Sequence, residues 1–458
     1  MTLTGQRPQT RLRQIPEARG NAVLGLLSDI RRDRLSLMLG LAERYGDAVR
    51  LSMGPKSLYF FNNPDHAKHV LSDNHANYTK GIGLRQAKRV LGDGLLTSEG
   101  EVWKRQRKTI APAFHRDRLS RFAGAVVDEA HALIDRWKAR PDGDRVEVVA
   151  DMTRLTLGVM GKALLDTDLG DQDDLGAAFA VVQDQAMFEM VTLGLLPQTN
   201  PLPRQRRFRA ASRKLDEAVA ELAARRRAEG FEGRDDMLSR LIAEYPDEND
   251  AVGRARLKDE LITILLAGHE TTASTLAWTW YRVSLDPRIR RRMRQEAVDV
   301  LGTRDPRFSD LHDLRYIGQV VQETMRLYPA VWLLTRQAKE PDGVGGYPVP
   351  AGADVVISPY TLHRHRGYWT DPEKFDPDRF DPGATDRIAS RHRYAYLPFG
   401  AGPRFCIGNN LGTMEAVLTA AMVAREFRLE SVPGHRVVAD PMLTLRVRDG
   451  LPMTVHRA

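Results

Sequence analysis

The sequence predicts a mainly α-helical protein with a small β region, folded as a single domain. Apolar residues recur at three- and four-residue steps over six long segments, which is the period of an amphipathic helix. Alternating, strand-like text is short and sparse. No linker, internal repeat or low-complexity segment divides the 458 residues, and 42% of them are hydrophobic, which is ample for one sizeable core.

The predicted elements follow from these patterns in chain order. Helices are expected at residues 34–46, 117–138, 206–229, 257–284, 288–301 and 315–327. Residues 48–63 are expected to form a hairpin that turns at Gly54–Pro55, and residues 353–360 a further short strand. The proline-rich patches 196–205 and 369–383 are predicted to be loops.

Positive charge is concentrated in arginine clusters. The net charge is +8, and the clusters occupy residues 204–214, 224–230 and 288–296. In each cluster the basic residues are interleaved with apolar residues at helical spacing, and none carries a recognised nucleic-acid-binding motif. We therefore interpret the clusters as solvated helix faces and expect no nucleic-acid partner.

The hydropathy of the chain indicates an intracellular protein. No apolar run approaches the roughly 18 residues of a membrane span, and the polar first twenty residues lack the apolar stretch of a signal peptide. We expect a cytoplasmic protein without a membrane anchor. Residues 1–22 are expected to be a flexible leader segment ahead of the main domain, residues 23–458.

The only cysteine, Cys406, lies in the stretch FGAGPRFCIG, residues 399–408. A lone cysteine is either an inert small hydrophobe or a single-thiolate ligand or nucleophile. Three glycines and Pro403 allow the backbone to approach something flat or bulky, and Arg404 offers a permanent cation. A helix is expected directly after Gly408, so that a thiolate is favoured at its N-terminus. These neighbours favour the functional interpretation.

A polar interruption occurs within the apolar helix predicted over residues 260–280. It consists of Gly268, His269, Glu270 and two threonines. These residues can also be explained without a function, because threonine can donate a hydrogen bond to its own helix and glutamate can face water. A glycine followed by an acid and hydroxyls nevertheless destabilises a buried helix, which suggests a ligand or a proton path there.

Two further pairs are weak signals alone. Glu323 and Arg326 lie three residues apart on one helix face, as ion pairs often do by chance. Trp103 and Arg107 lie one helical turn apart, where they could grip a carboxylate. Their significance depends on the motifs around them.

Together these stretches resemble the cytochrome P450 family, the haem-thiolate monooxygenases. The cysteine loop fits the haem-binding signature of that family at every defined position, Phe399-x-x-Gly402-x-Arg404-x-Cys406-x-Gly408. Residues 267–272 are similar to the oxygen-activation motif, and Glu323-x-x-Arg326 to the helix pair. The stretch 377–380 is similar to the segment whose arginine, here Arg379, completes an ion triad. The resemblance implies the cytochrome P450 fold.

The resemblance also implies haem b as the cofactor, with Cys406 as the iron ligand. The implied cofactor-binding residues are Trp103, Arg107, Arg336, Phe399, Arg404, Cys406 and Gly408. Glu270 and Thr271 are expected to relay protons during the activation of O2. Glu323, Arg326 and Arg379 are expected to be structural.

His269 is the competing candidate for an iron ligand, because histidine is a common haem ligand. A ligand within the distal motif would block the oxygen site. We therefore interpret His269 as hydrogen-bonded or solvated.

The chain is expected to receive NAD(P)H-derived electrons from a separate partner. It has no Gly-x-Gly-x-x-Gly fingerprint, one cysteine excludes an iron–sulfur cluster, and the about fifty residues after the haem loop are too few for a flavin domain. In the family the helix that carries Lys104, Arg105 and Lys108 borders the proximal face. The resemblance therefore implies an acidic ferredoxin or flavodoxin, with its reductase, as the donor.

The expected reaction inserts one oxygen atom of O2 into a hydrophobic small molecule such as a fatty acid, terpenoid or polyketide. By family position the pocket is lined from residues 80–97, 184–202 and 330–334. The named candidates for the pocket are Met187, Phe188, Ile264, Ala267, Val331 and Trp332. Two other function classes remain open. They are a haem-thiolate isomerase or peroxygenase, against which the intact pair Glu270–Thr271 argues, and a non-catalytic haem-binding sensor.

Overall fold

The computed structural model describes residues 13–20, 26–53, 56–169, 173–192, 194, 197–383 and 392–458. The chain divides into two compact units. The first unit is Met1–Ile82, Leu333–Thr370 and His392–Phe405, and the second is Gly83–Trp332, Asp371–Arg391 and Cys406–Ala458. Each unit is assembled from three separate stretches, so neither is a contiguous sequence domain. We describe each unit by itself.

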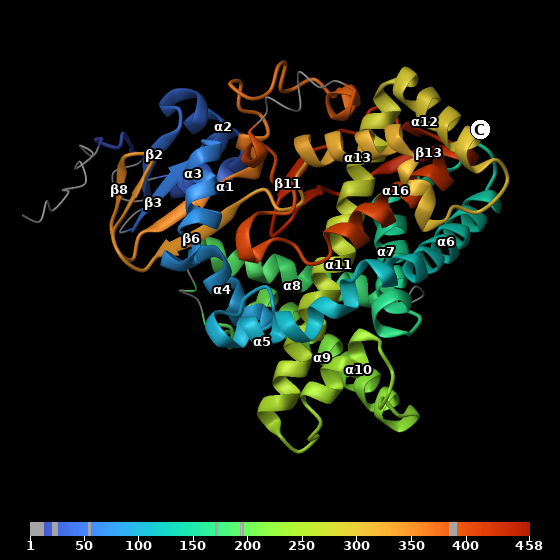
Figure 1. The fold of residues 1–458 in the computed structure, drawn as a ribbon, viewed down its shortest axis with the longest axis horizontal. Coiled ribbons are helices and arrows are strands. Elements are labelled where there is room, and N and C mark those ends of the chain that lie inside the picture. The colour runs from blue at the N-terminus through green and yellow to red at the C-terminus, as the bar shows by residue number, and fades with distance from the viewer. Residues whose placement is uncertain are drawn as a thin grey trace, which may run out of the picture. The chain divides into compact units, whose positions relative to one another are not determined.

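The first unit contains a six-stranded sheet in the order β1-β2-β3-β9-β6-β4. The strands are β1 (Glu17–Ala18), β2 (Ala48–Met53), β3 (Lys56–Phe61), β4 (Tyr78–Lys80), β6 (Leu334–Ala338) and β9 (Asp354–Ile357). Antiparallel pairing of β2 and β3 confirms the predicted hairpin, although its turn at Gly54–Pro55 lies outside the described residues. In Figure 1 these two strands, in blue, belong to the same sheet as the orange β6 from late in the chain, with β9 between β3 and β6.

Strand β9 confirms the strand predicted within residues 353–360, but the end of that segment is helical. Ser358 caps a short helix, α14 (Pro359–Leu362), by accepting a hydrogen bond from the amide of Thr361. Proline is well tolerated at the first helical position, which explains the change of structure at this point. The remaining elements of the first unit are α1 (Leu27–Arg32), α2 (Arg34–Tyr45), α3 (Pro64–Lys68), β7 (Asp342–Val344) and β8 (Tyr347–Val349).

Part of the predicted leader segment is described. Residues 13–20 include β1, which pairs in parallel with β2, and Glu17 accepts a hydrogen bond of 2.9 Å from Arg50. Residues 1–12 and 21–22 lie outside the described residues. The boundary between leader and main domain stays a prediction.

The second unit is predominantly helical. Its helices are α4 (Ile82–Leu91, whose first residue belongs to the first unit), α5 (Gly100–Ile110), α6 (Arg116–Lys138), α7 (Val148–Leu165), α8 (Asp173–Val191), α9 (Pro203–Glu229), α10 (Met237–Glu244), α11 (Ala251–Leu285), α12 (Pro287–Leu301), α13 (Arg315–Leu327) and α16 (Asn409–Glu426). With α2, they confirm all six predicted helices and the mainly α fold class. None of the described helices is long and apolar enough to cross a bilayer.

Two small sheets complete the second unit. One has the strand order β10-β13-β5 and the other pairs β11 with β12. The strands are β5 (Arg145–Glu147), β10 (Phe427–Ser431), β11 (Ala439–Pro441), β12 (Leu445–Val447) and β13 (Pro452–Arg457). The start of β12 reaches α11, because the carbonyl of its first residue, Leu445, accepts hydrogen bonds from Ser274 and Trp278.

Helix α11 is the long buried element of the second unit. Its N-terminus is capped by Asp250, whose carboxylate accepts a hydrogen bond from the amide of Val252. Helix α16 packs closely against it: a Cβ atom added at Gly412 would lie 3.4 Å from the Thr272 hydroxyl. The stretch that follows Cys406 is thereby held against the polar interruption of α11.

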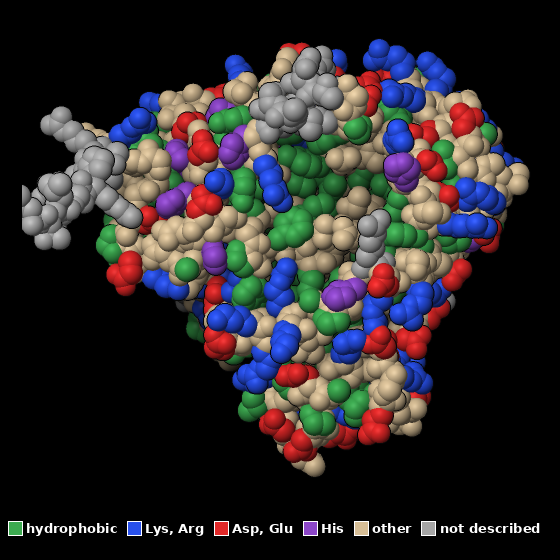
Figure 2. Space-filling view, in the orientation of Figure 1, with side chains coloured by type: hydrophobic (Ala, Val, Ile, Leu, Met, Phe, Trp, Pro, Cys, Tyr) green, Lys and Arg blue, Asp and Glu red, His purple; other side chains and the backbone are tan. Residues whose placement is uncertain are grey.

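The arginine clusters are not solvated throughout, which corrects the interpretation from the sequence. Arg226 of α9 is 1% exposed, forms an ion pair of 2.5 Å with Asp236 and donates to Ser239 and to the Leu165 carbonyl. It anchors α9 to α10 and to the end of α7. Over the face drawn in Figure 2, Lys and Arg side chains are interspersed with Asp and Glu.

A buried ion cluster holds α13 to the segment that begins at Asp371. Arg326 donates to both carboxylate oxygens of Glu323, at 2.6 and 2.8 Å, and to the carbonyls of Pro372 and Lys374. Arg379 lies 3.4 Å from the same carboxylate. The three charged side chains are at most 4% exposed. Removing one partner therefore leaves another charge buried and unpaired.

We expect Glu323→Ala or Arg326→Ala to lower the free energy of unfolding by about 3–5 kcal/mol and to give poorly folded protein, because a buried ion pair is broken. Chemical denaturation measures the change. The matched control is Glu221→Ala, which breaks an exposed pair with Arg225 of 3.1 Å and is expected to cost less than about 1 kcal/mol. Equal stabilities of the Glu323→Ala and Glu221→Ala proteins would contradict the prediction.

Candidate functional site

The cysteine loop has the tight backbone that its glycines predict. Gly400 and Gly402 adopt positive φ angles of 70° and 67°, which favour glycine. A Cβ atom at Gly402 would also collide with the Leu71 carbonyl oxygen. The rings of Phe399 and Phe405 lie 6.3 Å apart, centroid to centroid, at the two ends of this part of the loop. Substitution of Gly402 would therefore distort the approach to the cysteine.

Cys406 is the residue at which the loop enters the second unit, three positions before α16. Its side chain is exposed. The Gly408 amide donates a hydrogen bond to the sulfur, and the positive charge of Arg107 acts on it. Both effects lower the pKa of the thiol, but protein atoms crowded around the sulfur withdraw it from bulk water, and this burial raises the pKa overall. Burial thus opposes the thiolate form that the position before a helix N-terminus favours.

Helix α11 exposes one short stripe of small side chains. Ala267 is exposed and Thr271 half-buried, although the residues around them on the helix are mostly buried. The Thr271 hydroxyl donates a hydrogen bond of 2.7 Å to the Ala267 carbonyl. The two residues lie one turn apart and share a face. This stripe and the Cys406 side chain are accessible surfaces of the same unit.

Gly268 serves packing between helices. The sequence suggested that its missing side chain makes room for a ligand, but a Cβ atom there would collide with Met160 of α7. The space is therefore filled by protein. A side chain at this position would displace the end of the Met160 side chain.

Glu270 and Thr271 form hydrogen bonds with different partners. A carboxylate oxygen of Glu270 accepts a hydrogen bond of 2.6 Å from Thr444, between β11 and β12. Burial raises the pKa of Glu270 to about 7. The hydrogen bond from Thr444 and the positive charge of Arg446 lower the pKa, but by less than burial raises it. Arg446 in turn forms an ion pair of 2.8 Å with Asp184, which is partly exposed. Thr444 and Arg446 were not predicted, because nothing local in the sequence marks them as partners of a residue some 170 positions earlier.

His269 faces the protein interior. It is 2% exposed, its Nδ1 atom lies 2.6 Å from the Leu265 carbonyl, and its ring contacts that of Phe179 at 5.0 Å. Burial lowers its pKa to about 4, so the imidazole is neutral. The histidine is hydrogen-bonded rather than solvated.

The predicted carboxylate-binding residues are distributed over both units. In the second unit, the Arg107 guanidinium lies 5.8 Å from the centre of the Trp103 ring, and its charge acts on Cys406. In the first unit, Arg336 lies on β6 opposite Lys80 and donates to the Thr335 carbonyl, and Arg404 ends the short helix in the cysteine loop.

The pocket candidates differ in accessibility. Ala267 and Val331 are exposed, whereas Met187, Ile264 and Trp332 are buried. Trp332 donates a hydrogen bond of 2.9 Å to the Met442 carbonyl. Phe188 is half-buried beneath the guanidinium of Arg204, 4.7 Å from its ring centre. Residues 193, 195 and 196 of the predicted pocket region lie outside the described residues.

The described residues fit a haem group. A thiol ligand is accessible, a cation from α5 lies close to it, and a buried helix of the same unit exposes an alanine and a hydroxyl where a flat ligand and a small molecule could lie. A bound metal cation would also remove the thiol proton that burial favours. The arrangement can hold a metal through sulfur and supply proton donors on α11.

Comparison with known proteins agrees with this site. The family model for cytochrome P450 matches residues 16–448. Cyclooctatin synthase of Streptomyces melanosporofaciens is 34% identical, with 96% of each chain covered. Cyclooctat-9-en-7-ol 5-monooxygenase of the same organism is 33% identical, over 85% of this chain and 84% of that one. Protein LUTEIN DEFICIENT 5, chloroplastic, of Arabidopsis thaliana is 31% identical, over 97% of this chain and 77% of that one.

The family match covers nearly the whole chain, and the cysteine loop and the α11 motif fall inside it. Haem, O2 and electrons from a reductant follow from membership of the family. This chain belongs to the cytochrome P450 family and is a haem-binding monooxygenase of hydrophobic substrates.

Proposed function

We propose that this cytochrome P450 inserts one oxygen atom of O2 into a terpenoid, using haem b held through Cys406. The observation that carries the proposal is the accessible thiol of the only cysteine, next to Arg107 and in the same unit as the exposed stripe of α11. When bound, the haem supplies the iron centre at which dioxygen is reduced and activated. The chain supplies the ligand, the counter-charges and the protons.

Three residues are proposed to supply counter-charges, and a fourth a neutral hydrogen-bond donor. Two haem propionates brought into a protein need cationic or hydrogen-bonding partners. Arg107, Arg336 and Arg404 provide guanidinium groups, and Trp103 an indole N–H. The Gly408 amide orients the sulfur by its hydrogen bond, and Phe399 shields the loop.

Residues of α11 supply the protons. Because the Thr271 hydroxyl donates to Ala267, its oxygen is left to accept a hydrogen bond from a water at the exposed stripe. Glu270 has a pKa of about 7, which suits a group that both takes up and releases a proton near neutral pH. Asp184, paired with Arg446, offers an exchange route to solvent for that carboxyl group.

The substrate class is supported by the relatives and by the candidate pocket residues. The name of one relative describes an unsaturated alcohol, cyclooctat-9-en-7-ol, as its substrate. The candidate residues of this chain are apolar, as a hydrocarbon requires. The test is a panel of cyclic terpene alcohols, fatty acids and polyketide lactones, screened by the change in the haem absorption band on binding. We expect the terpene alcohols to bind most tightly, and a response confined to fatty acids would refute the class.

The electron donor is proposed to be a soluble acidic ferredoxin or flavodoxin, reduced by NAD(P)H through its reductase in the cytoplasm. Lys104, Arg105 and Lys108 are all exposed on α5, the helix whose Arg107 acts on Cys406. Only one of the three, Lys104, pairs with a carboxylate in the described contacts, that of Glu101 at 2.6 Å. Positive charge on this helix steers an acidic partner towards the thiolate side.

Reduced protein with carbon monoxide is expected to absorb at the long-wavelength position that thiolate ligation produces, because the sulfur of Cys406 is anionic once it binds iron. Cys406→Ala should abolish this band while leaving the helical circular dichroism unchanged. A wild-type spectrum typical of histidine ligation, or a band that persists in Cys406→Ala, would disprove the ligand assignment.

Thr271→Ala is expected to bind substrate and accept electrons normally but to release reduced oxygen as peroxide, because the water at the stripe loses its hydrogen-bond partner. The measurement is product formed per NAD(P)H consumed, and we expect a fall of at least about tenfold. The matched control is Thr275→Ala, one turn along α11, whose hydroxyl also bonds back, to the Thr271 carbonyl at 2.9 Å, but is buried. Equal ratios for the two variants would assign Thr271 a purely structural role.

The ratio of product to NAD(P)H is expected to fall as the pH rises through about 7, because burial raises the pKa of Glu270 to about 7 and the carboxyl group loses its proton there. Glu270→Gln should flatten the profile. Thr444→Val removes a hydrogen bond that lowers this pKa, so the inflection should move to higher pH. An inflection that stays unchanged in Glu270→Gln would exclude this carboxyl group as its source.

A further inference from the structure

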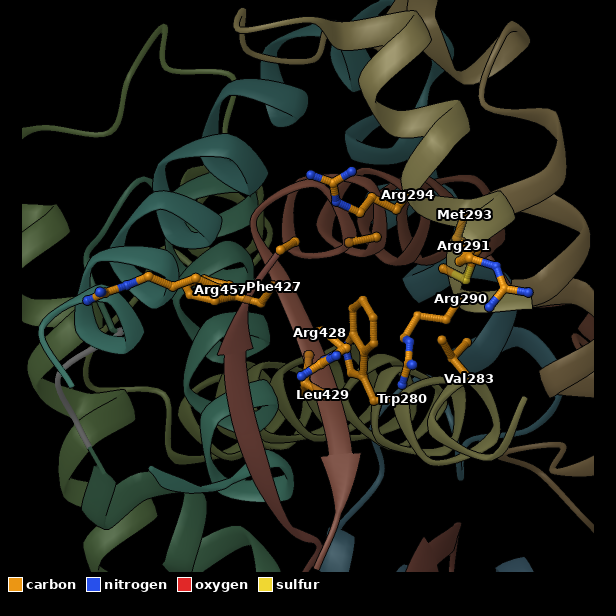
Figure 3. A pocket seen from close by; sticks show the side chains of 12 residues that line it. Trp280, Val283, Arg290, Arg291, Met293, Arg294, Phe427, Arg428, Leu429 and Arg457 are labelled. Carbon is orange, nitrogen blue, oxygen red and sulfur yellow. The ribbon is translucent and has the colours of Figure 1, made fainter. Parts of the chain in front are cut away.

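The second unit contains a basic pocket that none of the predicted haem or substrate residues lines. It lies where α11, α12, the end of α16 and the strands β10 and β13 meet (Figure 3). Its volume is about 490 Å³, within the range of roughly 300–1,000 Å³ that small-molecule sites have. The residues at its wall that matter for the argument are Trp280, Arg290, Arg291, Arg294, Arg428 and Arg457.

The arginines of the pocket are only partly neutralised. Glu430 lies 3.7 Å from Arg290 and 3.4 Å from Arg428, so one carboxylate serves two guanidinium groups. Figure 3 shows the Arg457 side chain directed away from the cavity, and it donates to the Lys138 carbonyl. Among the described residues no carboxylate pairs with Arg291 or Arg294, both of which are exposed on α12. The pocket therefore carries an excess of positive charge.

Trp280 provides a second, independent signal. The indole is 2% exposed, and its Nε1–H has no hydrogen-bond acceptor among the described residues. In Figure 3 the ring stands in the pocket between Arg290 and Arg428. A buried N–H without an acceptor is costly, and buried indoles usually find a partner. A ligand with an acceptor oxygen would satisfy it.

We propose that this pocket binds a small organic anion, with an apolar body against the Trp280 ring and a phosphate or carboxylate group that accepts from the Trp280 N–H and from Arg290 and Arg428, which flank the ring (Figure 3). Planar guanidinium groups match both head groups. The aromatic floor selects an organic body over an inorganic ion. This anion site is separate from the site of the substrate that is oxidised. The proposal does not depend on the identity of that substrate.

The probe is 1-naphthyl phosphate, titrated calorimetrically into the haem-loaded wild-type protein. We expect a Kd of about 100 μM or tighter at low salt, weakening at least about tenfold at high salt because the contacts are ionic. The haem absorption spectrum should stay unchanged, since the pocket is not the haem site. Neutral 1-naphthol and inorganic phosphate should each bind at least about tenfold more weakly. The first lacks the anionic group, and the second lacks the apolar body.

Variants assign the binding to the pocket. Arg290→Ser/Arg428→Ser should weaken the probe at least about tenfold and Trp280→Phe about threefold or more, because ionic contacts and one hydrogen bond are lost. Arg288→Ser is the matched control: it is an exposed arginine on the same helix, pairs with Asp286 and does not line the pocket. Absence of binding, equal weakening by Arg288→Ser, or haem spectral changes that track the titration would overturn the proposal. Displacement of the probe by phosphatidic acid vesicles would identify a lipid head group as the source of the anion, and lack of displacement a soluble one.

Discussion

The contact between α11 and α16 is the constraint on which the predicted haem site depends. Gly412 lets the two helices approach, and the Glu415 carboxyl group, 1% exposed, is hydrogen-bonded to Thr272. Burial raises the pKa of Glu415 well above its usual value, which favours the neutral acid and reduces the cost of burying this group. It sets where Cys406, before α16, lies relative to Thr271, beside Thr272. The proposed ligand and the proposed proton donor are thus positioned by one helix pair.

Burial dominates the electrostatics of the second unit. It raises the pKa of Cys406 and of Glu270 and lowers that of His269, and in each case the neutral form is favoured. Such an interior suits a site whose charges come with a cofactor. A metal cation would bind the sulfur, and the two carboxylates of the cofactor would pair with guanidinium groups of the protein. The cluster around Glu323 differs, since its charges are mutually paired and hydrogen-bonded to the backbone. This cluster stabilises α13, and its charged groups are engaged in structural contacts.

Helical periodicity predicted some elements and failed for others. Helices α6 and α12 present a solvated side, so their apolar residues recur with the helical period. Helix α7 is buried on most sides and α8 is apolar over much of its length, which erases that period and explains why both were missed. Strands such as β4, β5 and β11 have only three residues, too few to display an alternation. Tertiary pairing alone makes them strands.

Composition identified Cys406 as the single available thiol. Local spacing predicted the helix that follows it and placed Glu323 and Arg326 on one helix face. The family resemblance implied that Arg379 joins that pair, but only the tertiary structure decided that Met160 fills the space at Gly268 and that Thr444 donates to Glu270. It also assembled the arginine pocket from helices and strands that are remote in sequence. The physical reason is the range of the interactions. Turn geometry and helical periodicity act between neighbours in the chain, whereas side-chain packing and buried hydrogen bonds are decided by which distant segments the fold brings into contact.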